Sequence, residues 1–374
     1  MRRIHFFALL LVVLLGAAAC GGGEGPGGTT DGETGGTTGD VTDDATGGPT
    51  EDGDGESDIG GDITMARANW DTGFFQAEIY YQLLEELGYN VEHPSNNQMS
   101  AQVFYESVNN RDVDVWVNGW FPLHENFLSD ASNAEKVGTQ VKAGAFQGYL
   151  ADKATVEEHD ITSIEQIDDN PELAQLFDRD GNGQGDLIGC NSGWGCFESI
   201  EQHFNEGPLG DNLEHVSAEY SALMSETIAR HDRGEPILYY TWTPNWTVAE
   251  LKPGEDVVWL QSESHPDEQE PVPGDQVAGG AEACTSDPCN IGWAANDINV
   301  VANSDFLDEN PAAEELFKQV ELSVSRISEQ NAKMNAGNDS RSDIEAHAQN
   351  FIEANREKVD GWLQAARDAA GSSS

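Results

Sequence analysis

The sequence is poor in basic residues. Its 374 residues include 18 lysines and arginines but 68 aspartates and glutamates, so the formal net charge is −50 at pH 7. Because nucleic acids and anionic membrane surfaces repel such a chain, we expect neither as a partner. A solvated acidic surface suited to high salt is the simplest interpretation of this charge. A polycation-binding role is compatible with it but has no other support in the sequence.

The sequence also lacks the local motifs that mark the common enzyme classes. It contains no GxxxxGKS/T loop, no HExxH, no GxSxG and no SxxK with its partner motifs. Carboxylate pairs are so frequent in this chain that they carry no specific signal for acid–base catalysis. We therefore predict a protein that is not an enzyme. Two other classes stay open at this point, namely a secreted hydrolase that uses one such pair and a calcium-dependent adhesion module.

One long apolar run is present, and it lies at the N-terminus. Two arginines precede the run Phe6–Ala19, which is too short for a membrane-spanning helix and is typical of an export signal. Its ending LLGAAAC resembles the bacterial lipoprotein box, which predicts a signal peptide over 1–20 and lipidation of Cys20. A plain secreted protein is the alternative, because Ala17 stands where that box usually has leucine.

Residues 21–62 consist mainly of Gly, Thr, Asp, Glu and Pro. They include twelve acidic residues and no lysine, arginine or aromatic residue. Such a segment buries too little apolar surface to offset the entropy of ordering. We therefore expect a disordered, self-repelling tether.

Cysteine is scarce as well. Besides Cys20 there are four cysteines, which fall into two close pairs, Cys190 with Cys196 and Cys284 with Cys289. Neither pair has the two-residue spacing of a zinc site, and no histidine tract accompanies them. In an exported protein such pairs favour disulfides over metal ligands.

From residue 63 onward, helical and strand patterns alternate. Apolar residues recur every four positions from Phe75 to Leu87, which indicates one face of a helix that Gly88 ends. This alternation predicts an α/β fold with a βαβ opening. The expected elements include strands over 63–70, 89–93, 112–120, 237–242 and 256–261, and helices over 102–108, 311–330 and 342–370.

Three tryptophans stand where predicted strands pass into loops: Trp120, Trp194 and Trp242. Core packing is the ordinary role of a tryptophan, but three at such junctions favour a binding site. Indole faces attract weakly hydrated cations, and a quaternary ammonium leaves water without losing a hydrogen-bond donor. If the ligand also carries a carboxylate, the tight glycine loop around Trp194 and one histidine provide N–H donors.

Residues 178–186 read DRDGNGQGD and match the front of a calcium loop. Gly183 stands where the sharp turn is needed, but Gly189 occupies position 12, where such loops have a bidentate glutamate. A structural calcium site and a metal-free turn therefore both stay open, and no cofactor is required. The candidate ligands are Asp178, Asp180, Asn182, the Gln184 carbonyl and Asp186.

Four stretches together resemble the glycine betaine/proline betaine-binding proteins of bacterial ABC importers. They are NGWFPLHENF, GCNSGWGC, EPILYYTWTPNW and LKPGEDVVWLQ, and the similarity runs from about Ile63 to the C-terminus. The resemblance implies an α/β, two-lobed periplasmic-binding-protein-like fold with the ligand cleft between the lobes. Lobe 1 would combine 63–150 with 300–374, and lobe 2 would be 151–299.

The resemblance also implies which residues bind the ligand. It places Trp246 near these residues but not among them. The match departs at Ser192, where the family motif has proline, and at Trp70, which has no counterpart and is either core packing or an extra wall of the cleft. The residues that the resemblance assigns to the ligand are Trp120, Trp194 and Trp242 around its trimethylammonium group, and His124 with the backbone N–H groups of Gly195 and Cys196 at its carboxylate.

We therefore predict an extracytoplasmic solute-binding protein that is lipid-anchored to the outer face of the cell membrane, with a periplasmic location as the alternative. It would capture glycine betaine or proline betaine and deliver it to an ABC transporter permease for osmoprotectant uptake. We expect a monomer that contacts the membrane only through its anchor. Choline or carnitine is the alternative ligand, although the donors for a carboxylate argue against choline.

Overall fold

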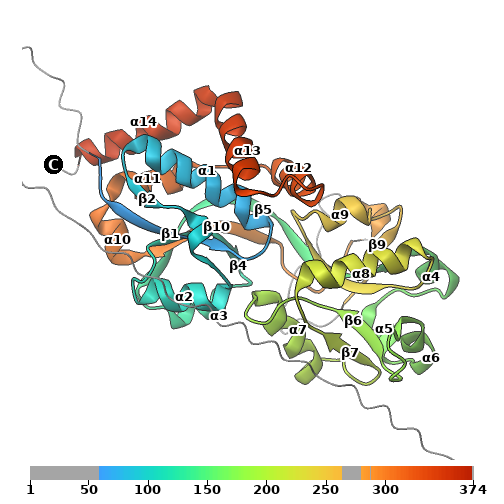
Figure 1. Cartoon of the computed structure of the whole chain (residues 1–374). Helices are drawn as coiled ribbons and strands as arrows, with labels where there is room; N and C mark the ends of the chain where they lie inside the picture. Colours follow the sequence, from blue (N-terminus) through green and yellow to red (C-terminus); the bar gives the residue numbers. More distant parts are fainter. Residues whose placement is uncertain (1–58, 263–278, 287, 373–374) are drawn as a thin grey trace, which may run out of the picture. The chain divides into compact units, whose positions relative to one another are not determined.

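The structure is a computed structural model, and it describes residues 59–262, 279–286 and 288–372 (Figure 1). The predicted signal peptide, Cys20 and all but the last four residues of the predicted tether lie outside the described residues. So do residues 263–278, which belong to the acidic stretch ahead of Cys284. Within the described part, no helix has both the length and the apolar character needed to span a bilayer.

The described chain opens with the expected βαβ unit. β1 (Asp62–Ala68) and β2 (Asn90–Glu92) pair in parallel, and α1 (Thr72–Leu87) connects them. The α1 helix ends at Gly88, whose φ of 105° lies in the left-handed region that glycine adopts without strain. Its N–H closes the helix by donating to the carbonyls of Glu85 and Leu84.

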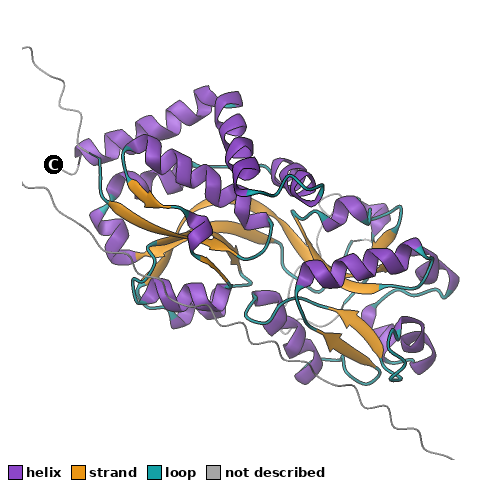
Figure 2. Ribbon diagram, viewed as in Figure 1, coloured by secondary structure: helices purple, strands orange, loops and turns teal. Residues whose placement is uncertain are grey.

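The sheet of the first lobe has the order β2-β1-β4-β10-β5. β1 and β4 are parallel, whereas β10 runs antiparallel to both β4 and β5. The helices α1 and α2 lie on opposite faces of these strands (Figure 2). The bounds are η1 (Pro94–Asn96), β3 (Gln98–Met99), α2 (Ala101–Asn109), β4 (Val115–Phe121), α3 (Glu125–Asp130), β5 (Ala134–Asp152) and β10 (Asn296–Asn303).

One strand, β5, belongs to both lobes. Its first part, up to Ala145, pairs with β10, and from Phe146 onward it pairs with β8. The chain returns to the first lobe between β9 and β10, so two crossing segments join the lobes. The expected two-lobed α/β fold is confirmed.

The second lobe continues the sheet in the order β5-β8-β6-β7, with β9 also paired to β5. Parallel pairing of β6 with β7 and β8 again produces a βαβ arrangement. The bounds are α4 (Lys153–Glu158), α5 (Ile164–Asp168), α6 (Pro171–Ala174), η2 (Gln175–Phe177), β6 (Gly185–Ile188), α7 (Gly195–Asn205), β7 (Leu213–Val216), α8 (Tyr220–Asp232), β8 (Leu238–Thr243), α9 (Thr247–Glu250), β9 (Val257–Trp259) and η4 (Ala281–Ala283).

The C-terminal helices differ from the prediction, since each of the two predicted helices is a pair. The break between α11 and α12 occurs because Val320 and Leu322 are buried in an extended segment, where Leu322 N–H donates to the Gln140 carbonyl of β5. The break between α13 and α14 occurs at Asn355, whose side-chain amide donates to the Phe351 carbonyl. The bounds are α10 (Ser304–Glu309), α11 (Pro311–Gln319), α12 (Val324–Asn335), α13 (Arg341–Ala354) and α14 (Arg356–Ser372).

Both cysteine pairs form disulfides in the structure. Cys190–Cys196 closes the loop that leads from β6 into α7. Cys284–Cys289 lies beside β9, where Cys284 makes a backbone bridge to Trp259. The first disulfide bears on the site described next, because it holds the start of α7 against β6.

Candidate functional site

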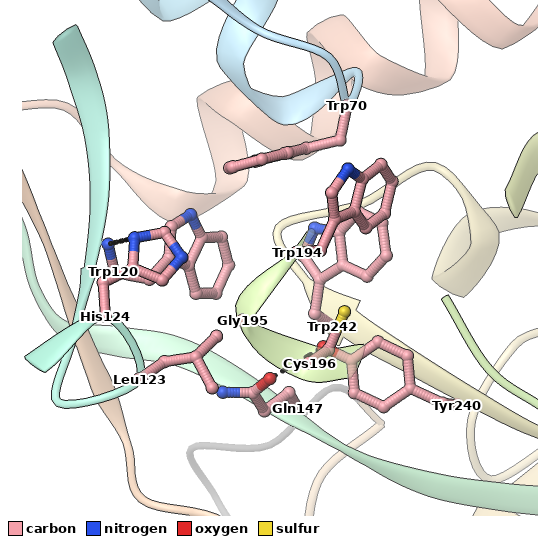
Figure 3. A pocket seen from close by; sticks show the side chains of 10 residues that line it. All are labelled: Trp70, Trp120, Leu123, His124, Gln147, Trp194, Gly195, Cys196, Tyr240 and Trp242. Atoms are coloured by element: carbon pink, nitrogen blue, oxygen red, sulfur yellow. Dashed lines mark hydrogen bonds between the residues drawn. The ribbon is translucent and has the colours of Figure 1, made fainter. Parts of the chain in front are cut away.

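The two lobes meet at a pocket that side chains from both lobes line (Figure 3), with a cavity of about 30 Å³. All six residues that the sequence predicts to bind the ligand line it. The lining residues are Trp70, Trp120, Leu123, His124, Gln147, Trp194, Gly195, Cys196, Tyr240 and Trp242.

Trp70 and Trp120 face the pocket from the first lobe. Trp70 follows β1 and Trp120 lies in β4, and their indole N–H groups donate to one acceptor, Asn118 Oδ1, at 2.8 and 2.9 Å. Asn118 is 1% exposed, and its own amide donates to Gln76 Oε1 in α1. Because a buried indole N–H needs a partner, the shared acceptor fixes both rings within this lobe.

Trp194 and Trp242 face the pocket from the second lobe. Nε1 of Trp194 donates to Asn69 Oδ1 at 2.7 Å, and Nε1 of Trp242 donates to Thr72 Oγ1 at 2.9 Å. Both acceptors belong to the first lobe, where they flank the connection between β1 and α1. The two rings meet edge to face, with centroids 5.8 Å apart and an interplanar angle of 84°.

Tyr240 lines the pocket two residues before Trp242, on the same face of β8, as the alternation of a strand requires. Its hydroxyl donates to Gln147 Oε1 in β5 at 2.7 Å. Burial raises the pKa of Tyr240 well above its usual value, so the hydroxyl stays protonated. This pair forms a neutral polar side of the pocket.

Helix α7 begins at the pocket. Its N-cap residue makes no side-chain hydrogen bond to the first turn, and the Cys190–Cys196 disulfide ties that turn to β6. The N–H groups of Gly195 and Cys196 stand in the first turn, where a helix has no internal acceptor and favours an anion. A Cβ at Gly195 would lie 2.8 Å from Leu123 Cγ and 2.9 Å from His124 Cδ2, so this close approach requires glycine.

His124 lies opposite the start of α7 and is neutral. Its Nδ1 accepts the backbone N–H of Trp120 at 3.2 Å, and the Tyr105 hydroxyl lies 3.5 Å from the same atom. With Nδ1 as the acceptor, this network assigns the ring proton to Nε2. Burial lowers the pKa of His124 to about 3, so the ring carries no charge at physiological pH. It therefore offers one N–H donor, from Nε2.

The described residues that line the pocket carry no charged side chain. None of its ten lining residues carries a carboxylate, ammonium or guanidinium group, although the chain has a net charge of −50. A carboxylate here would favour small hydrated cations and repel a negatively charged ligand group. The arrangement instead suits a ligand without net charge, with a poorly hydrated cation at one end and an anion at the other.

Three lining residues are absent from the prediction: Leu123, Gln147 and Tyr240. Trp70, for which the sequence leaves core packing and an extra cleft wall open, is a wall of the pocket. Its ring lies 5.2 Å from that of Trp194, and it follows the end of β1. Strand alternation from Trp242 points to Tyr240, whereas no local signal identifies the other two. Trp246 is buried at the start of α9 and is not among the lining residues.

The candidate calcium loop is separate from the pocket. Asp178, Asp180 and Asp186 each place one carboxylate oxygen within 4.8 Å of the others. Backbone N–H groups of Gly181 and Gly183 donate to the carboxylate of Asp178 at 2.7 and 2.9 Å. Asn182 Oδ1 accepts the backbone N–H of Gln184 at 2.7 Å. The donor set thus fits a hard cation, while the same oxygens also close the turn by hydrogen bonds.

A pocket lined by aromatic side chains, between two α/β lobes that β5 and a second crossing segment join, is typical of a periplasmic-type solute-binding protein. Residues 61–354 match the family described as OpuAC, the substrate binding domain of ABC-type glycine betaine transport systems. The chain belongs to this family, and it is therefore a substrate-binding protein of ABC transport and not an enzyme.

Relatives agree with this assignment. The chain is 40% identical over 298 residues to the glycine betaine-binding periplasmic protein OusX of Dickeya dadantii (strain 3937), covering 79% of this chain and 87% of that protein. It is 39% identical over 297 residues to the glycine betaine/proline betaine-binding periplasmic protein of Escherichia coli (strain K12), covering 78% and 86%. The closed glycine betaine complex of lactococcal OpuAC shares the fold, with a TM-score of 0.59, 18% identity, and coverage of 81% and 99%.

Proposed function

We propose that this protein captures glycine betaine or proline betaine in the pocket of four tryptophans and delivers it to the permease of an ABC importer, for osmoprotectant uptake. The observation that carries the proposal is the composition of the pocket. Four indole rings meet neutral N–H donors at one site, and none of the described residues that line it has a charged side chain. A methylated zwitterion is complementary to both parts.

The cation would lie among the tryptophans Trp70, Trp120, Trp194 and Trp242. A quaternary ammonium has no N–H to lose on leaving water, whereas a primary ammonium would leave three donors unpaired among indole faces. Each ring contributes about 0.5–2 kcal/mol to binding such a cation. Four rings therefore supply about 2–8 kcal/mol. Only the upper limit reaches the roughly 8 kcal/mol that micromolar affinity requires, and the entropy lost on binding reduces it further. A second anchor is needed.

The carboxylate supplies that anchor. The N–H groups of Gly195 and Cys196 and the Nε2–H of His124 would donate to it, and the first turn of α7 adds a favourable helix dipole. Hydrogen bonds to a charged group are worth about 1.5–3 kcal/mol each. Choline has no carboxylate, so it would leave these donors buried and unpaired.

Capture would proceed by lobe closure. The lining residues come from both sides of the crossing in β5, so a bound ligand touches both lobes and stabilises the closed arrangement. The predicted boundaries, 63–150 with 300–374 and 151–299, stay a prediction, which the change of pairing partner along β5 supports.

Isothermal titration calorimetry tests which ligand the pocket binds. We expect micromolar or tighter binding of glycine betaine and proline betaine, weaker binding of carnitine, and at least about 100-fold weaker binding of choline. Glycine, which lacks the methyl groups, serves as the matched control and should not compete. Preference for choline over glycine betaine would overturn the role given to the α7 donors, and effective competition by glycine would overturn the role given to the tryptophans.

The cellular location is a further part of the proposal. A signal peptide and lipidation at Cys20 would hold a monomer at the outer face of the membrane, but these residues lie outside the described part and only the sequence supports them. Cys20→Ser should release the protein from the membrane fraction. Retention of that variant in the membrane would contradict the anchor.

Calcium binding at Asp178, Asp180 and Asp186 stays a prediction beside the metal-free turn. The clustered carboxylates support the first, and the hydrogen bonds to Asp178 support the second. Thermal unfolding in calcium and in chelator separates them. A higher Tm in calcium that Asp180→Asn removes would support the metal site, and an unchanged Tm would leave a metal-free turn.

A further inference from the structure

The segment Asn69–Thr72, which leads from the end of β1 to the first residue of α1, contacts both pocket tryptophans of the second lobe. It is a fixed part of the first lobe, because Asn69 N–H donates to the Met99 carbonyl of β3 and Gly73 N–H donates to the Trp70 carbonyl. A Cβ at Gly73 would lie 2.6 Å from Ala68 Cβ, so the turn is tightly packed against the end of β1. It thus presents its side chains in a set position.

Two of these side chains accept hydrogen bonds from across the cleft. Asn69 Oδ1 accepts Trp194 Nε1–H at 2.7 Å, and Thr72 Oγ1 accepts Trp242 Nε1–H at 2.9 Å. The Thr72 hydroxyl also donates to the Pro244 carbonyl of the second lobe at 2.8 Å. An indole has a single N–H, so each lobe-2 tryptophan uses its one donor on the opposite lobe.

Trp70 lies between these two acceptors in the sequence. The contact that brings Asn69 to Trp194 also places the Trp70 ring 5.2 Å from the Trp194 ring. Figure 3 shows Trp70 facing the pair formed by Trp194 and Trp242. The same turn therefore supplies one wall of the pocket and orients two others.

The four rings of Trp70, Trp120, Trp194 and Trp242 form what we call the tryptophan box. We propose that Asn69 and Thr72 are positioning residues that couple closure of the lobes to completion of this box. This inference rests on the proposed function, since it assumes that the box holds the ligand. In the open protein, water would hydrogen-bond the indole nitrogens of Trp194 and Trp242. On closure the two acceptors replace that water and orient both rings, so the box reaches its binding geometry only when the cleft shuts.

The test is Thr72→Val, which keeps the shape of this fully buried side chain and removes its hydroxyl. We expect about 10-fold weaker binding of glycine betaine, because the closed state would bury an unpaired indole N–H. The loss should appear as faster dissociation in stopped-flow tryptophan fluorescence, with association nearly unchanged. Thr72→Ser, which restores the hydroxyl, should bind within about threefold of wild type.

Asn335→Ala is the matched control, because the Asn335 side chain bonds Glu250 Oε1 across the lobes at 3.0 Å on the exposed surface, away from the pocket. We expect less than about twofold change in that variant. Equal effects of Thr72→Val and Asn335→Ala would overturn the proposal. So would slower association with unchanged dissociation in Thr72→Val.

A double-mutant cycle tests the specific pair. Trp194→Phe keeps an aromatic face but removes the donor, so Asn69→Ala should weaken binding in the wild-type background and have little further effect in Trp194→Phe. Additive losses would overturn the role of Asn69. Titration of the wild-type protein tests the proposed function separately. If wild-type protein did not bind glycine betaine, the proposed function would fail; if it bound and the variants did not behave as expected, only the role of Asn69 and Thr72 would fail.

Discussion

The two halves of the tryptophan box are held by different kinds of contact. The tryptophans of the first lobe, Trp70 and Trp120, share Asn118 as an acceptor within their own lobe. The tryptophans of the second lobe, Trp194 and Trp242, bond acceptors on the opposite lobe. A hydrogen bond within a lobe contributes to folding, whereas one across a cleft contributes only when the cleft is shut. Asn118 therefore stabilises the folded first lobe in any state, whereas Asn69 and Thr72 stabilise the closed state.

Trp194→Ala should have the largest effect. It removes a ring that contacts both Trp70 and Trp242, and it also removes the donor to Asn69. We expect at least about 100-fold weaker binding of glycine betaine by calorimetry, with circular dichroism like that of wild type. Affinity close to wild type in this variant would contradict the binding role of the tryptophan box.

Asn118→Leu should lower the free energy of unfolding more than a change at a bond between the lobes does. The change would leave two buried indole N–H groups without their acceptor in the open and closed protein alike. We expect the free energy of unfolding of the ligand-free protein to fall by at least about 2 kcal/mol in denaturant titrations. Thr72→Val should lower it by less, and equal losses would erase the distinction between the halves.

Gly195→Ala should have an intermediate effect on affinity. A Cβ there would press on Leu123 Cγ and His124 Cδ2 at less than 3.0 Å, which displaces the imidazole from the carboxylate end of the pocket. We expect about 10-fold weaker binding of glycine betaine, since roughly one charged hydrogen bond is lost. The tryptophan end should keep its preference for methylated ligands over glycine, and a variant that lost that preference would show that the two ends are not independent.

The smallest expected effect is that of pH. Burial lowers the pKa of His124 to about 3, and none of the ten described lining residues has a carboxylate or ammonium group. Between pH 8 and pH 5 the histidine therefore stays neutral in the folded protein, although an exposed histidine would gain a proton near pH 6.5. Calorimetry should give affinities within about twofold across this range. A clear rise in affinity as the pH falls through 6.5 would show that His124 binds the carboxylate as a cation.

The site residues that the sequence predicts share a local signal. Trp120, Trp194 and Trp242 each stand at a junction that composition and alternation mark, and the structure places all three around one pocket. The C-terminal helices show where local signals end. Residues 311–330 have helical periodicity throughout, but burial of Val320 and Leu322 against β5 interrupts the helix.

By itself, the sequence determined the α/β alternation, the close cysteine pairs and the family motifs that mark the tryptophans and His124, because each depends on residues near one another in the chain. Only the tertiary structure decided that Trp70 is a pocket wall and that Asn69, Thr72 and Asn118 hold the rings. The Trp194–Asn69 and Trp242–Thr72 bonds join residues 125 and 170 positions apart. No local pattern encodes such a pair, since an asparagine or threonine after a strand is equally suited to a turn, and its partner is set by how the lobes pack.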